Sequence, residues 1–178
     1  MSTVPVYGLL AEFDSPDDLV VAGERAYADG YRRLDAYTPF PVHGLAEAIG
    51  FRTNRLPFRV LLGGIVGAGA GFFSQYYAAV IDYPLNVGGR PLNSWPAFIP
   101  ITFEVTILAA AATAVLGMLA LNGLPQPYHP VFNAPRFALA TRDRFFLCIE
   151  ATDPRFDSEA TRRFLEGLGA KEVTDVEP

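Results

Sequence analysis

The sequence predicts a membrane protein of the α+β class, in which a two-helix transmembrane hairpin is inserted between the two βαβ halves of a ferredoxin-like cytoplasmic domain. Three observations lead to this prediction. Two long apolar runs lie in the middle of the 178-residue chain, a strand–helix–strand pattern precedes them, and the same pattern follows them. The mean hydropathy is positive, at +0.22, although 19% of the residues are charged. The apolar excess is therefore concentrated in the two runs.

Both apolar runs are long enough to cross a bilayer. Residues 60–81 form 22 consecutive uncharged residues, and residues 96–121 carry Glu104 as their one charge in 26 residues. A helix needs about 20 apolar residues to span the hydrocarbon core, and a helix on a soluble domain usually shows a polar face, which both runs lack. We therefore expect spans at 59–81 and 96–122, joined by an outer, periplasmic loop at 82–95. Neither run has the position or layout of a signal peptide.

The charged flanks of the spans predict their orientation. Arginines precede the first span and follow the second, whereas the connecting loop holds a single one, Arg90. Positively charged residues favour the cytoplasmic side of a membrane. Both termini are therefore expected in the cytoplasm and the loop outside. The flanking arginines are Arg52, Arg55, Arg59, Arg136, Arg142 and Arg144.

Residues 1–58 are expected to hold the first half of the cytoplasmic domain and a juxtamembrane segment. Residues 4–13 and 31–37 have the composition of strands. The helix between them is capped by Asp14 or Ser15, has Pro16 in its first turn and is stopped by Gly30. This is one complete strand–helix–strand unit.

Residues 123–178 are expected to hold a tether and the second half of the domain. Strands are predicted at 144–151 and 170–176, and the helix between them begins at Asp157 or Ser158 and ends at Gly169. A unit of about 35 residues is too small to bury a core alone. The two halves are therefore expected to build one four-stranded antiparallel sheet with two helices on one face.

Two further segments join these halves to the spans. Residues 42–49 predict a short amphipathic helix at the membrane surface. Residues 124–137 contain four prolines and predict an extended tether, because proline excludes regular helix and sheet.

Small residues follow one face of the first span. Gly63, Gly67 and Gly71 recur every four residues, a spacing that lets two helix backbones approach closely in lipid. Gln75 continues the stripe by one turn. Two interpretations stay open: the stripe packs against the second span of the same chain, or it docks a helix of another protein.

Glu104 is the residue with the most specific chemistry in the spans. A carboxylate inside a bilayer costs about 3 kcal/mol on insertion scales, so it must be protonated, paired or exposed to a wet cavity. Counted from the loop side, Gln75 lies about 9 Å from Ile81 and Glu104 about 9 Å from Phe98, so the two residues are at comparable depths. A contact between them is one hypothesis; a proton-linked role and a contact with a neighbouring subunit are the others.

The outer loop is rich in turn-forming residues and is expected to contact other proteins or lipid headgroups. Tyr83 and Trp95 bracket the loop, as aromatic residues do at membrane interfaces. Arg90 is its single positive charge, available to a partner's acid or a lipid phosphate, or simply solvated.

Composition excludes several classes of function. One cysteine cannot supply a disulfide framework, a thiolate zinc site or an iron–sulfur cluster, and the net charge of −5 argues against nucleic-acid binding. Cys148 is expected to be a buried strand residue, and His43 and His129 are not expected to share a metal. No catalytic triad or phosphate-binding loop is apparent, so no cofactor, metal or catalytic residue is predicted in this chain.

Three segments then point to a known family. They are PFPVHGLAEAIG before the first span, DYPLNVGGRPLNSWPAFIPITFE from the outer loop into the second span, and HPVFNAPRFALATRDRFFLCIEATDP after it. Together they resemble the D subunit of alternative complex III, a bacterial quinol:electron-acceptor oxidoreductase. The resemblance covers nearly the whole chain.

The resemblance implies an accessory subunit of a multi-subunit complex in the bacterial inner membrane, serving respiratory or photosynthetic electron transfer. Quinol would be oxidised in a neighbouring polytopic subunit, and the haem c groups and iron–sulfur clusters would belong to the multihaem cytochrome and iron–sulfur subunits. The role implied for this chain is to scaffold the polytopic subunit. A contribution of Glu104 to proton conduction is left open.

Two other classes of function are compatible with the residues. Ferredoxin-like domains often bind small regulatory ligands, so a membrane-tethered sensor or regulatory protein is the main alternative, and an apolar cleft in the domain would favour it. A small transporter is the other, although two spans with one acid rarely form a path without oligomerising.

Overall fold

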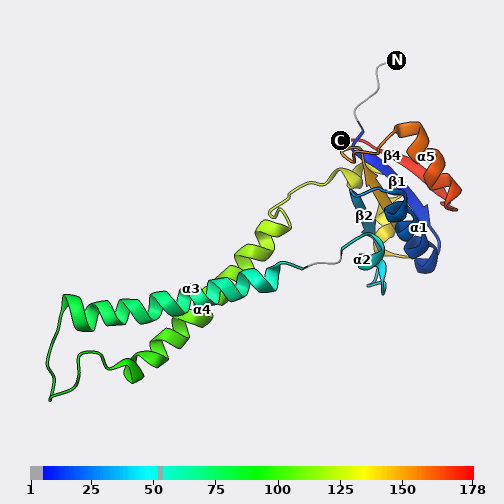
Figure 1. Ribbon diagram of the computed structural model, residues 1–178. Helices are drawn as coiled ribbons and strands as arrows, with labels where there is room; N and C mark the ends of the chain where they lie inside the picture. Colours follow the sequence, from blue (N-terminus) through cyan, green and yellow to red (C-terminus); the bar gives the residue numbers. More distant parts are fainter. Residues whose placement is uncertain (1–5, 52–53) are drawn as a thin grey trace. The chain divides into compact units, whose positions relative to one another are not determined.

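The computed structural model describes residues 6–51 and 54–178 (Figure 1). The chain divides into two compact units, Met1–Thr53 with Pro127–Pro178, and Asn54–Gln126. The first unit is the α+β domain and the second is the helical hairpin. Each is described by itself.

The domain contains a four-stranded sheet built from both ends of the chain. Its strands are β1 (Gly8–Phe13), β2 (Leu34–Tyr37), β3 (Phe145–Glu150) and β4 (Glu172–Val176). Their order is β2-β3-β1-β4, and each neighbouring pair is antiparallel. Each central strand pairs with strands from the other half, so neither half forms the sheet alone. This is the predicted ferredoxin-like arrangement.

Two helices cover one face of the sheet, as predicted. Helix α1 (Pro16–Asp29) is capped by Ser15, whose hydroxyl accepts from the Asp17 amide, and ends at Gly30 with φ 106°. Helix α5 (Ser158–Gly167) is capped by Asp157, which accepts from the Ala160 amide. The core between helices and sheet includes Leu9, Ala11, Phe13, Leu19, Ala22, Ala26, Phe145, Leu147, Ile149 and Leu165.

The strands are shorter than predicted. Strand β1 begins at Gly8, and residues 4 and 5 of its predicted range lie outside the described residues. Strand β2 begins at Leu34 rather than at residue 31, because the amides of Arg32 and Arg33 donate to the buried carboxylate of Asp153. Burial alone would raise the pKa of Asp153. The backbone hydrogen bonds to its carboxylate have the larger combined effect, so the pKa is lowered below its usual value. The side chain of Tyr31 turns into the core.

The prediction of an extended tether over residues 124–137 is wrong from Pro130 onward. Two 3-10 helical turns, Pro130–Asn133 and Phe137–Thr141, lie across the second face of the sheet. Their buried side chains form a second core with the outward residues of β1 and β3. Its members are Leu10, Val131, Ala134, Phe137, Ala140, Phe146, Cys148 and Val176. Prolines exclude α-helix here, but they do not prevent tight turns from burying apolar side chains.

The segment at 42–49 also differs from its prediction. Helix α2 (Leu45–Ala48) is a single turn, and Leu45 and Ala48 are buried. Val42, Leu45 and Ile49 pack against the core of the domain. The apolar face is therefore used inside the domain and is not free to enter lipid.

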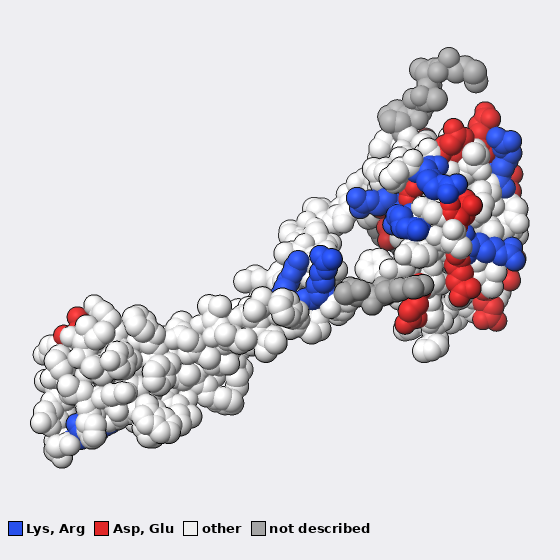
Figure 2. All heavy atoms as spheres, in the orientation of Figure 1, with Lys and Arg blue, Asp and Glu red and all other residues white. Residues whose placement is uncertain are grey.

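The hairpin consists of two long apolar helices. Helix α3 (Leu56–Tyr76) continues into a π-helical segment, Tyr77–Asp82, and α4 runs over Trp95–Leu121. Leu56–Asp82 and Trp95–Leu121 are long and apolar enough to cross a membrane. The face of the hairpin visible in Figure 2 carries charge only near its ends, whereas charges of both signs cover the visible face of the domain.

Candidate functional site

The stripe of small residues on α3 lies against α4. A Cβ on Gly67 would stand 2.5 Å from the Ala109 Cβ and 2.9 Å from the Val105 carbonyl oxygen. Gly71 approaches Thr102 and Val105 in the same way, and a Cβ on Gly63 would overlap the Thr113 side chain. Such spacing is possible only without side chains. The hairpin itself therefore occupies the stripe, so no face of glycines is left for another helix there.

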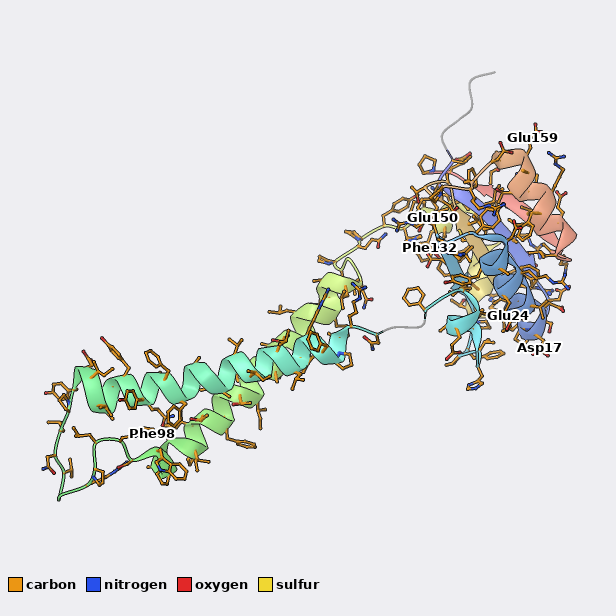
Figure 3. All side chains as sticks on the ribbon, viewed as in Figure 1. Asp17, Glu24, Phe98, Phe132, Glu150 and Glu159 are labelled. Atoms are coloured by element: carbon orange, nitrogen blue, oxygen red, sulfur yellow. The ribbon has the colours of Figure 1, made fainter. Side chains whose placement is uncertain are left out.

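Gln75 bridges the two helices but does not contact Glu104. Its amide nitrogen lies 2.9 Å from the Gly71 carbonyl oxygen, 3.0 Å from the Phe98 carbonyl oxygen and 3.2 Å from the Thr102 hydroxyl, so its two hydrogens are shared among three acceptors. Figure 3 labels Phe98, which is buried and packs edge-on against Phe72. The predicted Gln75–Glu104 contact is wrong, because similar depth in two spans does not place two side chains on facing sides.

Glu104 lies on the side of α4 that faces away from α3. Thr102, Val105 and Thr106 meet the glycines of α3, and successive residues are about 100° apart around a helix, which puts Glu104 on the opposite side. Its side chain is exposed, and within the described residues it has no hydrogen bond or ion pair. The hairpin thus leaves its one mid-helix acid unsatisfied.

The residues around Glu104 form a continuous exposed row along α4. This row, called the Glu104 face below, combines small and branched apolar side chains. It comprises Ala97, Ile101, Glu104, Leu108, Ala111 and Val115, all exposed. Its two alanines, Ala97 and Ala111, are of the small type that lets another helix approach closely.

The three outer-loop residues singled out by the sequence lie in two places. Arg90 donates to the Ser94 hydroxyl at 2.8 Å, so its guanidinium is used in shaping the loop. Tyr83 and Arg90 line a small hollow with Leu85 and Leu92. Trp95 is the first residue of α4 and lines a separate apolar groove with Phe72 and others.

A buried ion pair in the domain was not predicted. Glu12 on β1 is 2% exposed and accepts two hydrogen bonds from Arg136, at 2.6 and 2.8 Å. Arg144 lies 3.5 Å from the same carboxylate. The hydrogen bond from Arg136 holds the pKa of Glu12 below its usual range. The one sign of this ion pair in the sequence was Glu12, a charged residue inside a predicted strand. Its partner Arg136 lies 124 positions further along the chain, so the pairing could not be predicted.

Two residues that could in principle bind a metal, His129 and Cys148, instead have roles in packing and capping. The Nδ1 of His129 accepts from the Val131 amide and caps a 3-10 turn, and its ring meets the edge of Tyr7. Cys148 is buried in β3, where burial raises the pKa of its thiol to about 12. Across residues 6–51 and 54–178, no cluster of three or more His, Cys, Asp or Glu side chains is arranged to hold a metal.

The fold defines a class: a small protein with a hairpin of two helices long and apolar enough to cross a membrane, and a ferredoxin-like domain assembled from both ends of the chain. The sequence model of the family described as "Alternative complex III, ActD subunit" matches residues 7–175. The chain belongs to this family, as the resemblance predicted. It is therefore a subunit of a membrane complex, and the other subunits of that complex are its partners. No curated protein matches the chain significantly.

Proposed function

We propose that this chain is a scaffold subunit without a redox centre of its own, which docks on the polytopic quinol-oxidising subunit of alternative complex III through the Glu104 face. The hairpin lies in the bacterial inner membrane with both termini in the cytoplasm. The loop at 82–95 then faces the haem- and iron–sulfur-bearing subunits outside. The spans correspond to residues 59–81 and 96–122 of the sequence, and residues 1–58 and 123–178 supply the cytoplasmic domain.

One observation carries the proposal, the exposure of Glu104 on the side of α4 away from α3. Glu104 is nine residues after Trp95, a rise of about 14 Å, which is close to half of a 30 Å hydrocarbon core. An acid facing lipid at that depth costs about 3 kcal/mol or more. Contact with protein or with water enclosed by protein removes this cost, and the remainder of the hairpin does not supply it.

The rest of the Glu104 face indicates what kind of partner it meets. Ala97 and Ala111 are small, and Ile101 and Leu108 project beside them. Small residues let a second helix approach closely. The fitting partner is a transmembrane helix with larger side chains and a hydrogen-bond donor or cation at the depth of Glu104.

The domain supports a scaffold more than a sensor of small ligands. Helices α1 and α5 cover one face of its sheet, and the turns at Pro130–Asn133 and Phe137–Thr141 cover the other. No face of the described sheet is open to a ligand. The domain is therefore proposed to cap the cytoplasmic side of the complex.

Glu104 is also the candidate on this chain for proton conduction, because Gln75 is engaged within the hairpin. The two proposed roles of Glu104 predict different results for two substitutions. Glu104→Leu removes both the capacity to hydrogen-bond to a partner and the proton site. Glu104→Gln keeps hydrogen bonding but cannot exchange a proton in the physiological range.

The experiment measures co-purification of the subunits, quinol turnover and proton release from proteoliposomes for both variants. We expect Glu104→Leu to lower recovery of the assembled complex at least five-fold and Glu104→Gln to assemble normally. A lower proton yield per quinol in Glu104→Gln supports the proton role. Gln75→Leu is the matched control, because it removes an amide that faces inward. Normal assembly of Glu104→Leu contradicts docking through this face.

A further inference from the structure

We propose that the first turn of α3 binds the phosphate of an anionic phospholipid of the phosphatidylglycerol type, between Arg55 and Arg59. One acyl chain lies along the outward side of the same helix. The inference requires the hairpin to lie in a membrane, but it does not require the Glu104 face to dock on any particular subunit.

The two arginines carry positive charge that the hairpin leaves unbalanced. Arg55 and Arg59 are one turn apart and both exposed, and their guanidinium groups have no hydrogen bond or ion pair with any described residue. In the domain, by contrast, Arg136, Arg144 and Arg162 all form ion pairs. A pair of free arginines one turn apart fits a phosphate, to which each can donate two hydrogen bonds.

No acid of the hairpin lies near this end. The first turn of α3 contains no acidic residue, and residues 105–126, which include the inner end of α4, are all uncharged. Asp82 is 23 residues beyond Arg59, a distance of about 35 Å along the helix. The positive end of the helix dipole adds to the charge of the arginines instead of offsetting it. Figure 2 shows this end of the hairpin with blue side chains and no red ones in view.

An apolar track continues from the arginines along the same side of α3. Arg55, Arg59, Leu62 and Val66 are spaced three or four residues apart and share one side of the helix. Val66 is 69% exposed. Gly69 comes next, and a Cβ on it would meet nothing within 4 Å. The track therefore ends at Gly69, where the missing side chain leaves a shallow step in the helix surface.

The length of this track matches one leaflet. Gly69 is ten residues after Arg59, a rise of about 15 Å, which is half of a 30 Å hydrocarbon core. A phosphate held at Arg59 thus places the end of its acyl chain beside Gly69. The opposite side of α3 is filled by α4 at Gly63 and Gly67, so the outward side is the one available to lipid. A free phosphate or an acidic protein segment would use the arginines but not the apolar track.

The test compares lipid retained by the native complex after detergent extraction, counted by mass spectrometry. The double variant Arg55→Gln/Arg59→Gln is expected to retain at least five-fold less anionic lipid than the wild type. The double variant Arg55→Lys/Arg59→Lys is expected to show a smaller decrease. Arg90→Gln is the matched control, because it removes one arginine at the other end of the hairpin that already donates to Ser94. Its lipid content should equal that of the wild type.

A second variant tests the track without changing charge. Gly69→Phe fills the step beside Val66 and is expected to reduce the retained lipid, whereas Gly69→Ala should not. An unchanged lipid count in the double glutamine variant overturns the proposal. Exchange of anionic for zwitterionic lipid with no change in occupancy, or crosslinking of position 55 or 59 to an acid of another subunit, also overturns it.

Discussion

The domain and the hairpin each carry a glutamate inside an otherwise apolar element, and they differ in whether the chain supplies its partner. Glu12 in β1 is buried and fully paired by arginines of the same domain. Glu104 in α4 is exposed and has no partner among the described residues. The domain thus supplies the partners of its buried carboxylate from its own residues. The described part of the hairpin supplies no partner for Glu104, which is why we propose that one comes from another subunit.

The two regions also differ in how they pack. The domain core is filled by large side chains such as Phe13 and Phe146, as expected where burial from water supplies the driving force. The closest approaches in the hairpin are made by glycines of α3 against alanine, threonine and valine of α4. Since lipid is as apolar as leucine, close contact replaces the hydrophobic effect there. The stability of the hairpin should therefore respond most to substitutions that cause steric overlap, and that of the domain to substitutions that remove a paired charge.

The largest effect is expected from Gly67→Ala, with Gly69→Ala as control. The new methyl group at Gly67 would overlap Ala109 and a backbone carbonyl, whereas none is near Gly69. We expect a cost of about 3 kcal/mol in hairpin association for the first variant and little change for the second.

A cysteine pair at Gly64 and Ala110 measures this difference, because the Cβ positions are 3.7 Å apart and suit a disulfide. Oxidative crosslinking should be efficient beside Gly69→Ala and strongly reduced beside Gly67→Ala. Equal crosslinking in both backgrounds would show that the helices do not pack through this glycine.

A smaller effect is expected from Glu12→Gln in the domain. Loss of the charge-assisted bonds to Arg136 should cost about 2 kcal/mol, seen as faster hydrogen exchange of β1 and β3 amides with the hairpin unchanged. Because the folded pKa of Glu12 is lowered, its stabilisation is complete above the unfolded pKa of about 4.3 and is lost as pH falls below it. The gap between wild type and variant should close in acid; a constant gap would contradict the assignment.

Gln75→Leu should have a still smaller effect on the hairpin. It removes the hydrogen bonds to the Phe98 carbonyl and the Thr102 hydroxyl, and such bonds in membranes contribute about 1 kcal/mol. The same Gly64–Ala110 cysteine pair should report a modest decrease in crosslinking. A decrease as large as that of Gly67→Ala would mean that polar bridging, and not close packing, holds the helices.

The smallest effect is expected at Cys148. Its burial and its raised pKa, about 12, should make it inert to maleimide at pH 7 to 8 in the folded protein, since the thiolate is the reactive form. Labelling should appear only on denaturation. Rapid labelling of the native protein would show that the turns at Pro130–Asn133 and Phe137–Thr141 do not stay on the sheet.

The elements of the domain could be predicted because local signals set them. Ser15, Pro16 and Gly30 define one helix, and Asp157 defines the other. What could not be predicted depended on contacts across the fold. The turns around Val131 and Phe137 bury their side chains only because β1 and β3 present Leu10 and Phe146 to them.

The sequence predicted which residues of the hairpin belong to the candidate site, but not which of them lie next to each other. Glu104, Gln75 and the glycines were singled out by residue type and spacing. The depth of a residue in a span follows from counting, but the side of the helix on which it lies depends on how α3 and α4 pack. This is why Gln75 was paired with the wrong residue, and why the outward position of Glu104 appears only in the structure.

Photo-crosslinking from two positions tests most directly whether a partner covers the Glu104 face. A photoreactive residue replaces Leu108 beside Glu104, and in a second variant Val66 on the outward side of α3; these side chains are 68% and 69% exposed in the isolated chain. In the native membrane, position 108 should crosslink to another subunit of the complex and position 66 to lipid. Lipid adducts alone at position 108 would contradict the account.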